Sequence, residues 1–122
     1  MSKLSITLGV AFIPSNPVQT SINTPTERQE IEMAGEGYVH GVQEIGTTNE
    51  AVSFLTLADL SSPGYVLCRN LDLTNYVDLG ASSPPTIRLK AKESAIFRLA
   101  SPTLWAKADG APCRIEFWVF ED

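Results

Sequence analysis

The residue types that most often carry chemistry are scarce in this chain and are not spaced for it. His40 is the only histidine, and no second imidazole or paired thiol lies at the spacing of a zinc site. A metal or general-base role would therefore need carboxylates from distant parts of the chain, and we interpret His40 as a half-buried strand residue. No serine stands in a G-x-S-x-G sequence, and the glycines at Gly35 and Gly37 lack a P-loop lysine. The residues thus predict neither nucleophilic nor nucleotide chemistry, and we expect no enzyme activity, no metal and no cofactor.

Carboxylates are more numerous, with fourteen Asp and Glu in the chain. Two of them could in principle form the acid–base pair of a glycosidase. The best placed ones alternate with apolar residues, however, which is typical of the solvent face of a strand. We therefore assign a solubilising role to Glu30, Glu32, Glu36 and Glu44.

The two cysteines, Cys68 and Cys113, are 45 positions apart and form no C-x-x-C motif. Cys113 shares its strand parity with Ile115, Phe117 and Val119, which favours a position in the core. We interpret both as reduced, buried thiols. A disulfide between them is the alternative.

The segments that would have to position any of these residues are short, apolar and interrupted by turns. Ser61-Ser62-Pro63-Gly64 and Asp109-Gly110-Ala111-Pro112 are strong turn signals, and no segment is periodic enough for a substantial helix. Turns about every ten residues predict an all-β domain, a compact antiparallel β-sandwich or jelly roll of nine or ten strands. We expect 29–34 and 38–45 to form a hairpin across the two glycines. The full set of expected strands is 3–10, 29–34, 38–45, 51–57, 65–70, 76–79, 86–89, 95–99, 104–108 and 113–120.

The amino-terminal part differs in composition from the rest. Pro14, Pro17 and Pro25 lie among Ser, Asn, Thr and Gln, which favours an extended arm over a packed element. We divide the chain into a strand and Pro-rich arm at 1–28 and a β-sandwich domain at 29–122. The apolar stretch at 8–13 is too short for a signal peptide or a bilayer span, so we expect synthesis in the cytosol and no membrane partner.

The charge balance excludes one class of partner. The net charge is −5 and the isoelectric point is about 4.8. Binding to nucleic acid requires a concentrated face of Lys and Arg to neutralise phosphates. We therefore expect no nucleic-acid partner.

The last predicted strand is apolar on both faces. Ile115, Phe117 and Val119 can line the core, yet Trp118 and Phe120 have the opposite parity. A strand of a monomeric sandwich normally leaves one face in water. We expect the second face to be covered either by the Pro-rich arm or by another copy of the chain.

Five segments of the chain carry a resemblance to a known family: 38–48, 69–80, 89–99, 105–108 and 115–122. In these segments the sequence resembles small structural proteins of tailed bacteriophages. The resemblance begins at about Gln29, continues to the end of the chain and implies a β-sandwich component of the virion with no active site. Such domains serve as capsid decoration (cement) proteins or as tail and fibre components.

For a cement protein, the resemblance implies binding to the major capsid protein on the outer surface of the head. The chain would form a homo-oligomer, with a trimer favoured, and Trp118, Phe120 and Trp105 would be interface residues. Pro14, Pro17 and Pro25 would lie in an arm that contacts the capsid. The alternatives are a tail, baseplate or fibre-associated protein, and a carbohydrate-binding jelly roll that uses Tyr38, Tyr65, Tyr76 or Trp105 as stacking platforms.

Overall fold

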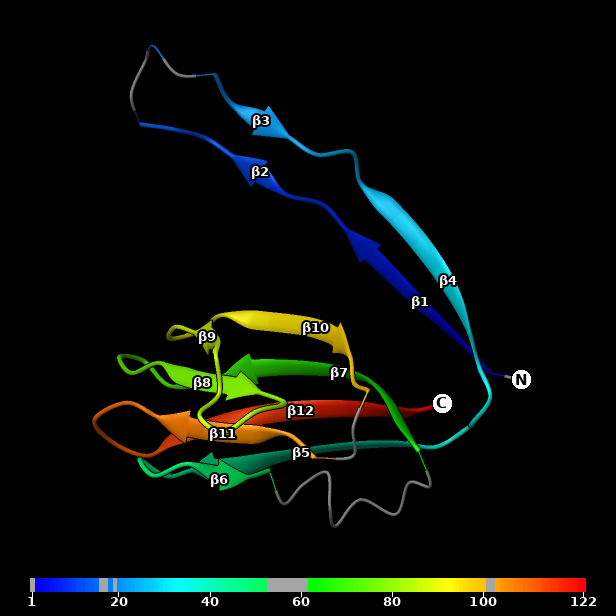
Figure 1. Ribbon diagram of the computed structural model, residues 1–122. Coiled ribbons are helices and arrows are strands. Elements are labelled where there is room, and N and C mark those ends of the chain that lie inside the picture. Colours follow the sequence, from blue (N-terminus) through cyan, green and yellow to red (C-terminus); the bar gives the residue numbers. More distant parts are fainter. Residues whose placement is uncertain (1, 16–17, 19, 53–61, 101–102) are drawn as a thin grey trace. The chain divides into compact units, whose positions relative to one another are not determined.

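The chain folds into two compact units in a computed structural model that describes residues 2–15, 18, 20–52, 62–100 and 103–122 (Figure 1). The first unit is Met1–Met33 and the second is Ala34–Asp122. Within the described residues every regular element is a strand, and every strand pair is antiparallel. The all-β class predicted from the sequence is confirmed.

The first unit is a two-stranded ribbon. β1 (Ser2–Leu8) pairs with β4 (Glu27–Met33), and β2 (Ala11–Phe12) pairs with β3 (Ile22–Asn23). Between the two ladders, Val10 N donates to Thr24 Oγ1 at 2.7 Å, and Thr24 N donates to Val10 O at 2.8 Å. The chain therefore runs out along β1 and β2 and returns antiparallel to itself along β3 and β4.

The expected hairpin of 29–34 with 38–45 is wrong. β4 pairs with β1, whereas β5 (Tyr38–Ile45) pairs with β12 (Cys113–Glu121). Alternation fixes which side chains share a face but does not say which strand lies alongside. The strand that begins the chain matches β4 because Leu4 lies opposite Ile31, so both strands present an apolar face on the same side.

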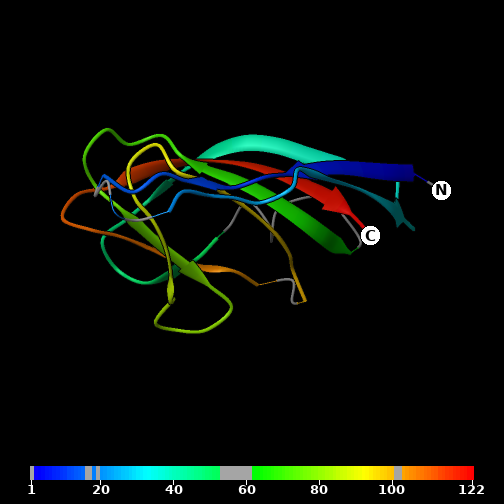
Figure 2. The ribbon, with the colours of Figure 1, turned by 90° about the horizontal axis from the view of Figure 1, so that it is seen from above.

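The second unit contains two four-stranded sheets, with the orders β10-β7-β12-β5 and β6-β11-β8-β9 (Figure 1). In the first sheet, β12 lies directly between β7 and β5, and Figure 2 shows it running along β7. The remaining bounds are β6 (Glu50–Ala51), β7 (Pro63–Asn70), β8 (Val77–Gly80), β9 (Ile87–Leu89), β10 (Ser94–Arg98) and β11 (Trp105–Ala108).

The pairing in the second unit follows a simple rule. β5 pairs with β12, β6 with β11, β7 with β10 and β8 with β9. The first four strands thus pair with the last four in reverse order. Additional ladders join β12 to β7 and β11 to β8, and these ladders assemble the four pairs into two sheets.

Both sheets contribute to one buried cluster. Alternate residues of β12, such as Ile115, Phe117 and Val119, are fully buried, as predicted from their parity, and so are Val77 and Leu79 of β8 in the other sheet. Each strand with one buried face contributes every second residue to this core. The predicted strands from 65 onward match β7 to β12 within a few residues. The strand expected at 51–57 falls mostly on residues outside those described, apart from β6 at its start.

One polar residue belongs to this core. Asn70, at the end of β7, is 0% exposed. Its Nδ2 donates to the carbonyl oxygens of Asn75 at 3.0 Å and of Leu89 and Lys90 at 3.2 Å each, while its Oδ1 accepts from Asp72 N at 3.0 Å. A buried amide with its hydrogen bonds made stabilises the fold, so Asn70 fixes the connections around β8 and β9 against the end of β7.

Candidate functional site

His40 lies on β5 with its ring on the outer face of the β10-β7-β12-β5 sheet. Nε2 is 2.8 Å from Glu116 Oε2, and the imidazole stacks on the Trp118 ring with centroids 4.6 Å apart and planes 9° apart. These contacts come from β12, on which Trp118 is the cross-strand partner of His40. The histidine therefore belongs to a surface cluster of aromatic and charged side chains on neighbouring strands.

The other candidate chemical residues do not converge. Glu30 pairs with Arg28 on β4 at 3.2 Å, and Glu36 and Glu44 are exposed. Within the described part of the chain, no three His, Cys, Asp or Glu side chains come close enough together to hold a metal ion. Where the structure places them, these carboxylates therefore lie apart from one another and from any metal-binding cluster.

Cys68 and Cys113 are both free and buried. Burial raises the pKa of the Cys68 thiol to about 12, because the charged thiolate is disfavoured away from water. The pKa of Cys113 is also raised, first by burial and then by the negative charges of Asp72 and Asp109. The prediction of two reduced core thiols is confirmed, and neither is an activated nucleophile.

The second apolar face of β12 is real, and its neighbours cover part of it. Trp118 and Phe120 are half-buried on the outer face of the sheet. Trp118 lies between His40 of β5 and Leu67 of β7, and Phe120 stacks on Tyr38 with ring centroids 6.5 Å apart. The surface that these side chains form is continuous across three strands.

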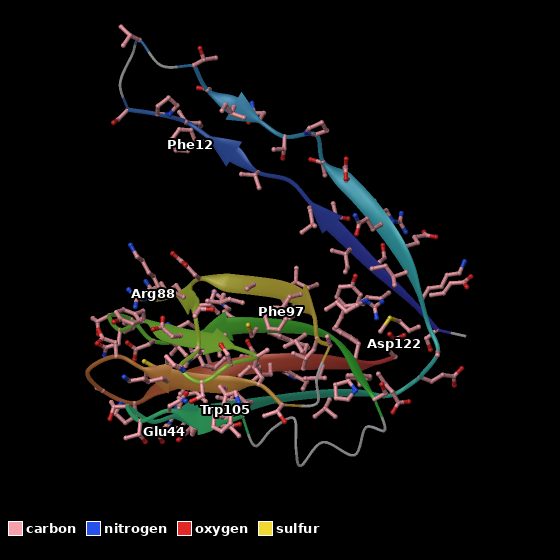
Figure 3. All side chains as sticks on the ribbon, in the orientation of Figure 1. Phe12, Glu44, Arg88, Phe97, Trp105 and Asp122 are labelled. Carbon is pink, nitrogen blue, oxygen red and sulfur yellow. The ribbon has the colours of Figure 1, made fainter. Side chains whose placement is uncertain are left out.

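Trp105 lies elsewhere. It is on β11 of the other sheet, opposite Ala51 and Gly80, and Figure 3 shows it in the body of the second unit. Since Ala106 and Ala108 face the core, Trp105 has the outward parity of its strand. The structure therefore does not bring Trp105 together with Trp118 and Phe120 on one sheet.

Two of the proposed sugar-stacking rings are covered by arginine side chains. The Arg88 guanidinium lies 3.7 Å from the centroid of the Tyr76 ring and is held there by Asp78 at 2.8 and 3.2 Å. Arg98, which pairs with Asp122, lies 4.6 Å from the centroid of the Tyr65 ring. The ring face that each arginine covers is not available to stack on a sugar.

The first unit carries a different kind of surface. Near β1 and β4 its ribbon has a polar face with Lys3, Arg28 and Glu32 and an apolar face with Ile6 and Met33, which are 8% and 2% exposed. Farther along, the large apolar side chains are exposed; Phe12 of β2 is labelled in Figure 3. We call this set the apolar tip; its residues and exposed fractions are Leu8 49%, Val10 65%, Phe12 58%, Ile13 77%, Val18 86% and Ile22 59%.

The apolar tip was missed by reasoning from the prolines. Pro14 follows β2 and is half-buried, Pro25 is exposed between β3 and β4, and Pro17 lies outside the described residues. The signal that could have found the tip was the apolar stretch at 8–13, which we considered only as a targeting segment. Phe12 and Ile22 are cross-strand partners, so the pairing itself brings apolar residues from the two strands together.

Comparison of the chain with protein-family models, with curated proteins and with solved structures gives no match. Among the described residues no helix has the length and apolar character needed to cross a membrane. The candidate surfaces therefore rest on the geometry of the chain itself.

Proposed function

We propose that the second unit is a β-sandwich of the jelly-roll type. The support is the reversed pairing of β5 to β8 with β9 to β12, which is the pattern of one long hairpin rolled into two sheets. The buried cluster that both sheets share is the core expected of such a sandwich. Jelly rolls occur in viral capsid and lectin domains, and the fold alone does not choose between these uses.

We propose further that the chain is a structural protein of a tailed-phage virion. Its function in this proposal is that of a capsid decoration (cement) protein, which binds the outside of the head and stabilises it by bridging capsid subunits. The observation that carries the proposal is the apolar tip, whose six large side chains are about half or more exposed. Large exposed apolar side chains that gather on a surface mark an interaction site, and here the pairing of Phe12 with Ile22 brings two of them together. The resemblance to phage structural proteins supplies the kind of partner.

The physical mechanism is added interface area. A ribbon of two strands is marginally stable by itself in water, so a protein partner that buries the apolar tip would also order the ribbon. A ligand that binds the assembled shell and not its separated subunits stabilises the shell by mass action. Each bound copy therefore raises the heat or force needed to open the head.

The partner in this proposal is the major capsid protein, and the location is the outer capsid surface after synthesis in the bacterial cytoplasm. The net charge of −5 agrees with a protein partner and not with packaged nucleic acid. We also expect copies of the chain to associate with one another. The residues expected to carry that association were Trp118, Phe120 and Trp105, of which only the first two share a surface.

The copy number in purified particles tests this proposal. A quantitative gel of virions should show the chain in an amount comparable to the major capsid protein, and heads separated from tails should retain it. A handful of copies that follow the tail fraction would instead establish the alternative role in the tail, baseplate or fibre. Absence from particles would refute both virion roles.

A further inference from the structure

Among the described residues, β5 is the longest edge strand of the second unit, and no strand pairs with its outer edge. Within the described residues the edge strands of the two sheets are β5 and β10 in one and β6 and β9 in the other. β6 has two residues, β9 three, β10 five and β5 eight. Short edges offer little backbone to a partner, whereas a long edge is a template for another strand. Natural edges are often protected by Lys or Pro, and β5 contains neither of these residues.

The backbone groups that face the open edge can be assigned from the ladder to β12. Glu121 N donates to Gly37 O, and Gly37 lies two residues before Val39 on the same side of the chain. In an antiparallel pair, the residues that exchange hydrogen bonds alternate with those that do not. Odd-numbered residues from 37 to 45 therefore face β12, and the N–H and C=O groups of the even-numbered residues point to the open edge.

The side chains of those even-numbered residues lie on the outer face of the sheet in the order Tyr38, His40, Val42 and Glu44. Val42 is 52% exposed, and His40 and Glu44 lie at equal distances on either side of it. Suppose that β5 of a second copy pairs antiparallel with this strand, so that the two Val42 residues lie opposite each other. His40 of each copy then lies opposite Glu44 of the other copy, which gives two such pairs. His40 Nε2 is already 2.8 Å from Glu116, and its other ring nitrogen, Nδ1, is the group that a carboxylate across the strand pair can meet; polar pairs placed directly opposite each other stabilise a strand pair.

Other registers lack this match. Moving the centre of symmetry to His40 sets two histidines opposite each other and places Glu44 opposite Glu36. Centring the pair on Gly41 sets His40 opposite Val42 and Tyr38 opposite Glu44. Of these three registers, the one centred on Val42 sets Val42 opposite its own counterpart and each His40 opposite a carboxylate, with the open hydrogen-bonding groups of both strands facing each other.

We propose that β5 is a homodimer interface, in which the β5 strands of two copies pair antiparallel about a two-fold axis at Val42. The occupant of the edge is thus a second copy of this chain. The β10-β7-β12-β5 sheets of the two copies then form one eight-stranded sheet, and the His40 and Trp118 rings of both copies lie on the same face of it. A self-complementary contact of this kind closes at two copies, so this proposal predicts a dimer where the resemblance implies a trimer, and it does not depend on binding to a shell.

The first test is the mass of the full chain in solution by sedimentation velocity and light scattering. We expect twice the chain mass of 13.2 kDa. A monomer at every concentration, or a trimer, would overturn the proposal.

Substitutions at Val42 separate this edge from other surfaces. Val42→Pro removes an N–H that points to the open edge and leaves the ladder to β12 its hydrogen bonds, since proline is tolerated on an edge strand. We expect this variant to be a folded monomer and the matched variant Val42→Thr, which keeps the N–H, to remain a dimer. Glu44→Gln should weaken the dimer several-fold without a change of fold. A dimer that is equally strong in Val42→Pro would place the contact elsewhere.

Crosslinking tests the register. Residues that face each other in a hydrogen-bonded antiparallel pair have Cα atoms about 5.5 Å apart, within the range of a disulfide. Under mild oxidation Val42→Cys should therefore give a covalent dimer on a non-reducing gel. Tyr38→Cys should not, because eight residues separate it from its counterpart along the paired strands, about 27 Å at a rise of about 3.4 Å per residue. Because Cys68 and Cys113 are buried, they do not compete. Efficient crosslinking at position 38 and none at 42 would refute the proposed register.

Discussion

Phe12 gives the sharpest test of the apolar tip as the surface that contacts the head. Full burial of a phenylalanine side chain contributes up to about 3 kcal/mol. Because Phe12 is already 42% covered, being 58% exposed, a partner that buries the rest gains about 1–2 kcal/mol. Phe12→Ser should therefore weaken binding to heads about five- to thirty-fold, at about 1.4 kcal/mol per factor of ten.

The assay is co-sedimentation of the purified chain with heads from a phage that lacks its gene. Leu73→Ser is the matched control, because Leu73 is 74% exposed but lies in the second unit. Both variants should keep the melting temperature of the unchanged protein, because both side chains are largely in solvent. Equal affinity of Phe12→Ser and the unchanged chain, with Leu73→Ser weakened instead, would refute the assignment of the contact to the apolar tip.

Three further predictions concern the second unit. Cys68 and Cys113 should resist thiol reagents at pH 8 in the folded protein and react in urea, and fast labelling of the folded protein would contradict their burial. Because the pKa of Cys68 is raised from 9.0 to about 12, the free energy of unfolding should fall as pH rises between these two values. Asn70→Ala should lower the free energy of unfolding by about 2–3 kcal/mol, because it leaves buried carbonyl groups unpaired, and should lower the melting temperature by roughly 10–20 °C. Asn75→Ala should cost much less, because Asn75 contacts Asn70 through its backbone carbonyl. Asp72 accepts hydrogen bonds from the N–H groups of Asn75 and Thr74, which lowers its pKa. Its contribution to stability is therefore present above its unfolded pKa and lost as pH falls through the lower folded value. Asp72→Asn should flatten the acid side of a plot of stability against pH.

Strand positions in the second unit could be predicted because each strand has one buried face. The parity of Ile115, Phe117 and Val119 specifies the core, and the opposite parity of Trp118 and Phe120 specifies an apolar outer face; both are as observed. Turn signals such as Asp109-Gly110 separate the strands, and Gly110 has a φ of 71°, a conformation that glycine adopts readily. The buried face of a strand and the turn that ends it can therefore be predicted without knowing which strand pairs with it.

Pairing was the part that the sequence did not determine. β4 has glycines after it and another strand beyond them, which suggested a hairpin, yet it pairs with β1. The alternation of Ile31 and Met33 is equally satisfied by either partner, because it depends on the face and not on the neighbour. The long-range pairs such as β5 with β12 likewise have no local signature.

The candidate surfaces were predicted unevenly for the same reason. Phe120 and Trp118 were found by parity within one strand, whereas the self-complementary edge of β5 became visible only once its neighbour and the direction of its backbone groups were known. The apolar tip depends on the pairing of Phe12 with Ile22. The prolines between these two residues favoured an unpaired arm in the prediction from sequence. Surfaces that one strand defines can be predicted from sequence, and surfaces that two strands define require the structure.

The stability of heads with and without the chain tests the central claim most directly. DNA release from purified heads can be followed by a dye during heating, first for heads that lack the chain and then after the purified chain is added back. The account predicts that bound chain raises the release temperature and that Phe12→Ser at the same concentration raises it less. An identical release temperature for bare heads and for heads saturated with the chain would contradict a stabilising role on the capsid.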